Sequence, residues 1–518
     1  MSTGSKQMLL IVLAPLALLL CACVKAGSPA HSGDSAAAWP AMPEPGPMPG
    51  FEVPEAHSFK LSNGIPVTFV QVGSIPMVQL QLNIHSGSAS DPAGMSGRAS
   101  LAAAMLKEGT TEHSAIELSE LLLDLSSGVG MSTSLEHSAA SLRCLEDKLD
   151  ETLALLASML RSSTFNEADF ERLREQRRSS LLAEQDRLEV LGYRAFRRLV
   201  YGDSYAGRSA RGTLDSIENI TVQDLINWHA RAWIPANASL VMVSRMSPEL
   251  AQAALERALG SWQPGDFAAA MQLDPIPAAE LAPQPPAYQQ GARQDTAVYW
   301  IDRPGAAQSY ITVGQSAPAW DAQLQASRSL GNSPLGGQFT ARLNMNLRED
   351  KGYTYGARSS VSGLQQGGSF RARASVKTAT TAKALVEFLY EIKGIVGERP
   401  IQADEFAAGQ GRYLQGYPSY FEGIQGVLSQ FASADAKQRP EGWLAGYRKR
   451  ISAVTMEQAQ AQLNDMIDPD KLVIVVVGDY AAVGAEVAAL ELGAMVMLDI
   501  HGDPIVKTED GADSEAGD

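Results

Sequence analysis

One segment of this chain combines residue types that could act on a peptide bond. It reads LGGQFTARLNMNLREDKGYTYGA over residues 335–357 and contains Arg348 and Tyr355. A guanidinium and a phenolic O–H aimed at one point are donors that can bind a peptide carbonyl and stabilise the oxyanion formed when it is attacked. Taken alone, the segment favours a simpler interpretation, in which Arg348 is a surface residue at a helix end and Tyr355 fills space on a sheet.

The elements around these two residues decide whether their side chains can meet. The paired glycines Gly336 and Gly337 predict a turn with close backbone approach, an amphipathic run carries Arg348, and an aromatic strand start carries Tyr355. Helices and strands differ in side-chain period, so a cation and a phenol at this separation meet only where one element passes into the next.

The chain contains an internal duplication. TVQDL at 221–225 leads to Pro235, and TMEQA at 455–459 leads to Pro469; both offsets are 234 residues (455 − 221 and 469 − 235). Self-similarity at this scale predicts two copies of one fold rather than a solenoid. Blocks of strands between helical hairpins predict an α+β fold of two homologous domains, each a mixed or antiparallel sheet with helices on one face.

Side-chain patterns place the elements of both copies. The first is predicted to contain a hairpin around Asn63 and Gly64, a strand at 77–84, helices at 97–107 and 115–125, strands within 131–145, and helices within 149–160 and 167–199. The second is predicted to begin with a strand at 297–301 and to end with a buried strand at 472–477.

Length and composition set the expected domain limits. The 518 residues are enough for two or three domains. We expect a signal peptide at 1–22, a flexible stalk at 23–50, an N-terminal domain at 51–270, a Pro-rich linker at 271–295, a C-terminal domain at 296–500 and an acidic tail at 501–518. The net charge of −16 argues against nucleic acid as a partner.

The N-terminus predicts an exported, lipid-anchored protein. Lys6 precedes one apolar run at 8–20, which is too short and too early for a membrane span. The run ends in LCAC at Cys23, which resembles the bacterial lipobox and implies cleavage before Cys23 and lipidation of its thiol. An ordinary secretory signal cut near Ala22 is the alternative. Val24 rather than Asp follows, which implies an outer-membrane lipoprotein facing the periplasm.

The ordered motifs resemble the insulinase-type, or pitrilysin-type, zinc peptidase family. They are LSNGIPVTFV at 61–70, YGDSYAGRSARGT at 201–213, IDRPGAAQS at 301–309, the segment at 335–357 and VVVGD at 475–479. Each motif is weak alone, but their order across two repeats makes the resemblance specific. The family pairs two homologous α+β domains. Its first domain carries the inverted motif His-x-x-Glu-His on a helix, where two imidazoles bind Zn²⁺ and the Glu is the general base.

That zinc motif is degenerate in this chain. The matching segment is GRASLAAAMLKEGT, and the motif positions fall on Ser100, Ala103 and Ala104, none of which replaces a His ligand or a carboxylate base. Glu184 lies roughly where the family's third ligand falls, although an exposed Glu on a long helix is the simpler interpretation. No two of the seven histidines lie within five residues of each other, and convergence of distant histidines in space stays open. We therefore expect no cofactor in this chain, and zinc on a partner subunit.

The resemblance gives Arg348 and Tyr355 a role. Active family members use an Arg and a Tyr seven residues apart in the second domain to bind the substrate carbonyl opposite the zinc. Arg348 and Tyr355 match that spacing (355 − 348 = 7), whereas Tyr353 does not. Some bacterial members divide the zinc motif and the Arg/Tyr pair between two chains.

The resemblance thus implies a non-zinc-binding subunit of a heterodimeric metallopeptidase, which offers its Arg and Tyr to a partner's zinc for the hydrolysis of unfolded or short peptides. The alternative is a catalytically inactive peptide-binding or structural pseudo-peptidase at the outer membrane. A third, weaker alternative is an active enzyme with a rebuilt metal site.

Overall fold

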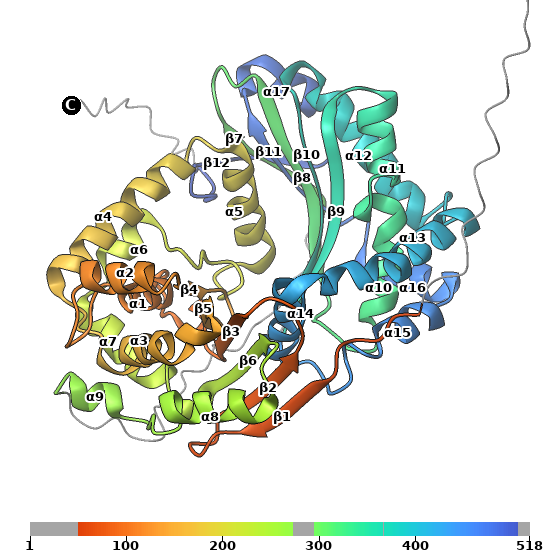
Figure 1. Ribbon diagram of the computed structural model, residues 1–518. Helices are drawn as coiled ribbons and strands as arrows, with labels where there is room; N and C mark the ends of the chain where they lie inside the picture. The colour runs from red at the N-terminus through yellow and green to blue at the C-terminus, as the bar shows by residue number, and fades with distance from the viewer. Residues whose placement is uncertain (1–49, 273–294, 366, 506–518) are drawn as a thin grey trace, which may run out of the picture. The chain divides into compact units, whose positions relative to one another are not determined.

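The computed structural model describes residues 50–272, 295–365 and 367–505 (Figure 1). The predicted signal peptide, Cys23 and most of the predicted stalk, linker and tail lie outside the described residues. No helix within the described ranges is long and apolar enough to cross a membrane.

The first sheet has six strands in the order β1-β2-β6-β3-β5-β4. β2 and β6 are parallel, and the other neighbours are antiparallel. The strands are β1 Ala56–Lys60, β2 Pro66–Gln71, β3 Met77–Ile84, β4 Gly128–Thr133, β5 Ser138–Leu145 and β6 Ala238–Ser244.

The second sheet has six strands in the order β12-β7-β11-β8-β10-β9. β7 is parallel to both β11 and β12, and the other neighbours are antiparallel. The strands are β7 Ala297–Asp302, β8 Gln308–Ala317, β9 Thr354–Leu364, β10 Gly367–Lys377, β11 Val473–Gly478 and β12 Ala494–Leu498.

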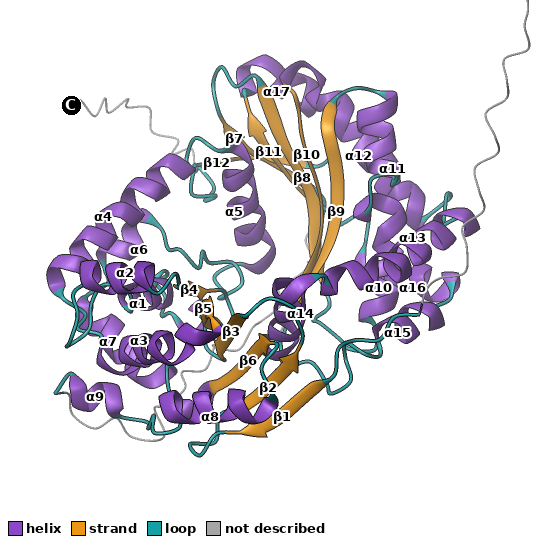
Figure 2. Ribbon diagram, in the orientation of Figure 1, coloured by secondary structure: helices purple, strands orange, loops and turns teal. Residues whose placement is uncertain are grey.

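Helices surround both sheets (Figure 2). Those before the linker are α1 Arg98–Met105, α2 Ala115–Asp124, α3 Leu149–Ser162, α4 Glu167–Glu184, α5 Leu188–Tyr201, α6 Leu214–Glu218, α7 Val222–Ala232, α8 Pro248–Leu259 and α9 Asp266–Ala270. Those after it are α10 Gln325–Asn332, α11 Arg342–Asn344, α12 Thr381–Val396, α13 Ala403–Gly416, α14 Gly423–Ala436, α15 Tyr447–Ala453, α16 Met456–Met466 and α17 Tyr480–Ala488. Short 3-10 helices are η1 Ser88–Ser90, η2 Glu146–Lys148, η3 Pro235–Asn237, η7 Thr378–Thr380 and η8 Tyr417–Phe421, and π-helices are η5 Ser333–Gly337 and η6 Met345–Asp350.

The duplication is visible in the sheets. β2, β3, β4, β5 and β6 have the same neighbours and directions as β7, β8, β9, β10 and β11. Thr221 and Thr455, which are 234 residues apart in the sequence, both cap a helix: each side chain accepts from the third helical N–H, and α7 and α16 follow. The sheets differ at one edge, where β1 is antiparallel and β12 parallel to its neighbour. The predicted α+β fold of two homologous domains is confirmed.

The predicted elements lie close to the observed ones, with one break. The helical stretch expected at 167–199 is divided into α4 and α5, because Arg187 has an extended backbone (φ −100°, ψ 103°) that ends one helix and starts the next. Because of this break, α5 packs against β8 and β11 of the second sheet, whereas α4 packs against α1 and α6.

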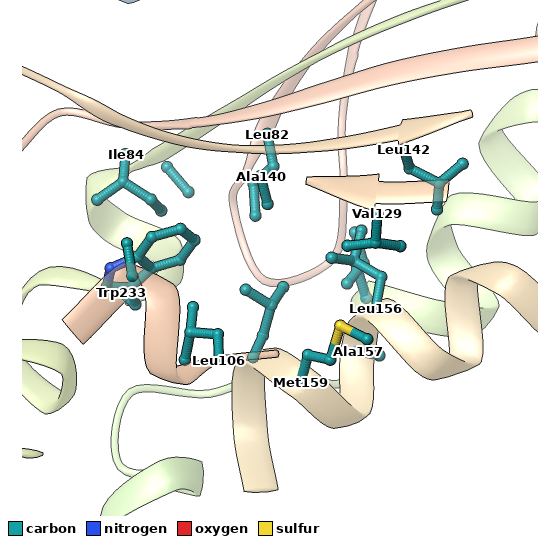
Figure 3. Packing of buried hydrophobic residues seen from close by; sticks show 14 of the residues in the cluster. Leu82, Ile84, Leu106, Val129, Ala140, Leu142, Leu156, Ala157, Met159 and Trp233 are labelled. Atoms are coloured by element: carbon teal, nitrogen blue, oxygen red, sulfur yellow. The ribbon is translucent and has the colours of Figure 1, made fainter. Parts of the chain in front are cut away.

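The core of the first domain lies between one face of its sheet and its own helices (Figure 3). Leu82 and Ala140 are cross-strand partners on β3 and β5, and they face α3, whose Leu156 and Met159 are also fully buried. The amphipathic pattern of α3 therefore selects the face that it buries.

The opposite faces of the two sheets are covered by helices from the other repeat. On β11, Ile474 and Val476 pack in the C-terminal core, whereas Val475 and Val477 pack against α5. On β6, the alternate face packs against α14. The two helices begin 235 residues apart (423 − 188), so they are equivalent in the duplication. Because both faces are buried, β6 and β11 each contain a continuous apolar run, at 240–243 and 473–477.

Candidate functional site

The degenerate motif lies on α1, whose N-terminus is held by a buried carboxylate. Asp91 accepts the backbone N–H groups of Gly97 and Ala99, each at 3.0 Å, and its Oδ1 lies 3.5 Å from Nε of Arg98. Gly97 has a φ of 101°, which favours glycine at this cap. Burial raises the pKa of Asp91 to about 6, although Arg98 and the two N–H groups act in the opposite direction. The start of α1 is thus fixed by one side chain.

At the first motif position the structure places a guanidinium contact. The Ser100 hydroxyl donates to the Gly97 carbonyl at 3.0 Å and accepts from Nη1 of Arg177 on α4 at 2.8 Å. Ala103 is buried and Ala104 is half-buried. Arg177 also donates to the Arg211 carbonyl at 2.8 Å.

Glu184 is bound by two arginines. Its Oε1 lies 2.8 Å from Nη1 of Arg211, and its Oε2 lies 3.1 Å from Nη2 of Arg194. Its side chain is only 14% exposed, so the interpretation of Glu184 as an exposed helix residue is wrong. It faces α5 and the loop before α6. The arginines of these two elements cover the carboxylate and compensate its charge.

The residues on α1 and α4 do not fit zinc. The motif positions supply one hydroxyl and two methyl groups, and a cation already contacts that hydroxyl. Within residues 50–272, 295–365 and 367–505, no group of three or more His, Cys, Asp or Glu side chains could hold a metal ion.

In the C-terminal domain, the paired glycines lie in a helix and not in the predicted turn. Gly336 and Gly337 end the π-helix η5. A Cβ on Gly336 would lie 2.3 Å from the backbone nitrogen of Ser359, so the missing side chain lets η5 approach β9 closely. The expected close approach exists, but it joins a helix to a strand.

Arg348 lies in the second π-helix, η6, and its side chain is 39% exposed. The guanidinium carbon lies 4.8 Å from the centre of the Phe339 ring, and Nε lies 3.2 Å from Oε1 of Glu349. The aromatic face and the neighbouring carboxylate orient the cation while leaving part of it accessible.

Tyr355 lies at a β-bulge, and 91% of its surface is exposed. In the β9–β10 register, Thr354 pairs with Val376 and Ala357 with Ala374, so two residues oppose the single residue between them. Thr354 Oγ1 donates to the Ser375 carbonyl at 2.7 Å and accepts from the Gly356 N–H at 3.1 Å. The bulge re-aims the phenol away from its own domain.

Asn344 joins the two parts of this site. Its side chain is buried; Nδ2 donates to the Phe339 carbonyl at 2.7 Å, and Oδ1 accepts from the Ala357 N–H at 3.2 Å. One amide therefore holds both the residue under Arg348 and the strand of Tyr355. Sequence reasoning missed Asn344; its weak helix propensity within a helical run was the available signal. The competing phenol of Tyr353 packs on the core.

Comparison with known proteins agrees with this architecture. Residues 70–204 match the family described as Insulinase (Peptidase family M16), and residues 219–412 match the one described as Peptidase M16 inactive domain. The chain carries two insulinase-type domains of peptidase family M16.

Individual M16 relatives are distant. The non-peptidase homolog YmxG of Helicobacter pylori is 22% identical over 67% of this chain and 77% of its own length. An uncharacterized zinc protease of Streptomyces coelicolor, SCO5738, is 20% identical over 79% of this chain and 86% of its own. A crystal structure of a peptidase M16 inactive domain from Pseudomonas fluorescens has a TM-score of 0.72 at 24% identity, over 82% of this chain and 98% of that one, which shows the shared fold.

Proposed function

We propose that this protein is the non-zinc-binding subunit of a two-chain M16 peptidase. Its Arg348 and Tyr355 complete an active site whose zinc is held by a partner chain. The partner belongs to the same family and carries an intact His-x-x-Glu-His helix. The substrate is an unfolded or short peptide. The guanidinium and the phenol bind the scissile carbonyl and stabilise the oxyanion. A zinc ion held by the partner's motif would supply the activation of the attacking water.

The observation that carries this proposal is the geometry of Tyr355. A phenol exposed over 91% of its surface, on a strand that bulges at that residue, has no packing role in its own domain. Arg348 is oriented by Phe339 and retains exposed surface. A pure scaffold has no need for either feature. The guanidinium contact at Ser100 is the reason to assign the metal to another chain.

The test is reconstitution with an M16 chain that has an intact zinc motif. Alone, the protein should cleave no peptide and bind no stoichiometric zinc. In the mixture, Arg348→Ala or Tyr355→Phe should each lower kcat by about 10²–10³-fold, as expected for loss of one oxyanion donor, without changing assembly measured by size-exclusion chromatography.

Two matched substitutions separate chemistry from packing. Tyr353→Phe removes a phenol two residues away, and Arg358→Ala removes an exposed cation from the same strand. Both should leave kcat within about twofold. Equal losses in the control and test variants, or intrinsic activity with one zinc per chain, would overturn the proposal.

The second candidate is a pseudo-peptidase that binds peptides or serves a structural role. The name of the Helicobacter pylori relative, non-peptidase homolog, favours it. It predicts that no zinc-bearing M16 chain assembles with this protein and that Tyr355→Phe changes no rate.

We further propose that Cys23 carries lipid and anchors the protein to the outer membrane, facing the periplasm. The LCAC sequence at the end of a short apolar run supports this proposal. Cys23→Ala should move the full-length protein from the membrane pellet to the soluble periplasmic fraction. Retention of the variant in the membrane pellet would contradict lipid anchoring.

A further inference from the structure

The degenerate zinc position is positively charged. Three arginines, Arg177, Arg194 and Arg211, surround the single carboxylate of Glu184, which leaves a formal charge of +2 (3 − 1). Their elements are α4, α5 and the loop before α6. Arginine side chains therefore supply the positive charge that a metal ion would carry in an active family member. Their summed charge exceeds the negative charge of Glu184.

The excess charge resides mainly on Arg177. Both oxygens of Glu184 are used by the other two arginines. The hydrogen bonds of Arg177 go to neutral acceptors, Ser100 Oγ and the Arg211 carbonyl. Among the residues that the structure describes, no carboxylate lies within 4.0 Å of its nitrogens.

The surroundings of Arg177 disfavour this uncompensated cation. The pKa of Arg177 is lowered to about 10, chiefly by burial and also by the charge of Arg211, and Glu184 only partly offsets these two effects. Ala103 and Ala104, next along the motif, contribute only methyl groups. A half-buried charge without a partner is costly, and an added anion would remove that cost.

The cluster is open on one side. The Arg211 side chain is 51% exposed, and its Nη2 donates to Ser180 Oγ at 2.7 Å, which fixes its position. The Nε and Nη2 atoms of Arg177 are outside its two hydrogen bonds to Ser100 and Arg211. A guanidinium fork with free donors matches the two oxygens of a carboxylate.

We propose that Arg177 and Arg211 form a binding site for a peptide carboxylate at the degenerate zinc position. The carboxylate is either the C-terminal group of a peptide or an Asp or Glu side chain within it. The site thus takes an anion in the place where an active family member holds a cation. This site concerns the single chain and does not depend on a zinc-bearing partner.

The test measures peptide binding to the purified full chain alone, by fluorescence anisotropy. The probes are three labelled peptides of one neutral sequence: one with a free C-terminus, one amidated, and one amidated with a single internal Glu. The wild type should bind at least one carboxylate-bearing peptide about tenfold more tightly than the neutral amide, with the preference falling as salt is added. Which acid binds identifies the source of the carboxylate.

Variants then locate the site. Arg177→Gln keeps hydrogen-bonding capacity and should abolish the preference, and Arg177→Lys should reduce it because it keeps the charge but loses the fork. Arg178→Gln is the matched control, since Arg178 is adjacent on α4 but pairs with Glu218 at the surface. Equal binding of all three peptides by the wild type overturns the proposal even if a variant fails to fold. So does an unchanged preference in Arg177→Gln.

Discussion

His229 should make the stability of the first domain pH-dependent, and its replacement by Phe should remove that dependence. The residue lies on α7, is fully buried, and neither ring nitrogen has a hydrogen-bond partner among the described residues. The centre of its ring lies 4.1 Å from the ring centre of Phe267, 5.5 Å from that of Phe165 and 5.9 Å from that of Trp233. This apolar cage lowers the pKa of His229 to about 3.

The sign and size follow from the two pKa values. In the unfolded chain the pKa of His is about 6.5. Above that pH both states are neutral, and His229 adds no pH dependence. As the pH falls below 6.5, the unfolded state takes up a proton that the folded state refuses until about pH 3. Once the pH is well below 6.5, each further pH unit costs about 1.4 kcal/mol, and the total cost between pH 7.5 and 4.5 is about 2.7 kcal/mol.

The assay is urea unfolding followed by tryptophan fluorescence at about pH 7.5 and 4.5. The wild type should lose about 2–3 kcal/mol more stability on acidification than His229→Phe. Any constant packing cost of the larger Phe ring cancels in this difference, and the exposed His501→Phe should behave as the wild type. Identical losses in the wild type and His229→Phe would refute the reasoning.

Three further predictions concern the same framework. Asp91→Ala should destabilise the protein by about 2 kcal/mol in urea unfolding, because α1 loses its cap, whereas Asp91→Asn, which keeps an acceptor, should cost less; equal costs would contradict the capping role. Phe196→Ala should lower the free energy of unfolding by about 3–5 kcal/mol, because the ring is buried where α5 packs on the second sheet. A loss below about 1 kcal/mol would show that the packing of α5 on that sheet contributes little to stability. Placing His, Glu and His at positions 100, 103 and 104 should not restore stoichiometric zinc while Arg177 is present, because two cations would compete for one site, and adding Arg177→Ala should raise zinc content measured by atomic absorption. One zinc per chain with Arg177 intact would contradict that competition.

Local pattern was sufficient for most elements of the fold. The strand at 77–84 matches β3, and the helix at 115–125 matches α2, because side-chain periodicity is read over a few neighbouring residues. The constant offset between Thr221 and Thr455 revealed two domains without any knowledge of their contacts. The seven-residue spacing of the Arg and Tyr was equally readable, as was the loss of the zinc motif.

Tertiary structure decided what those residues touch. Exchange of α5 and α14 between the repeats depends on which apolar face meets which sheet, and sequence period does not identify that partner. The exposure of Tyr355 depends on a bulge set by pairing with β10, and the contact between Ser100 and Arg177 joins residues 77 positions apart. The sequence determined which residues and elements are present, because these follow from short-range chemistry. Their surroundings came only from the packed fold, because burial and charge pairing join distant parts of the chain.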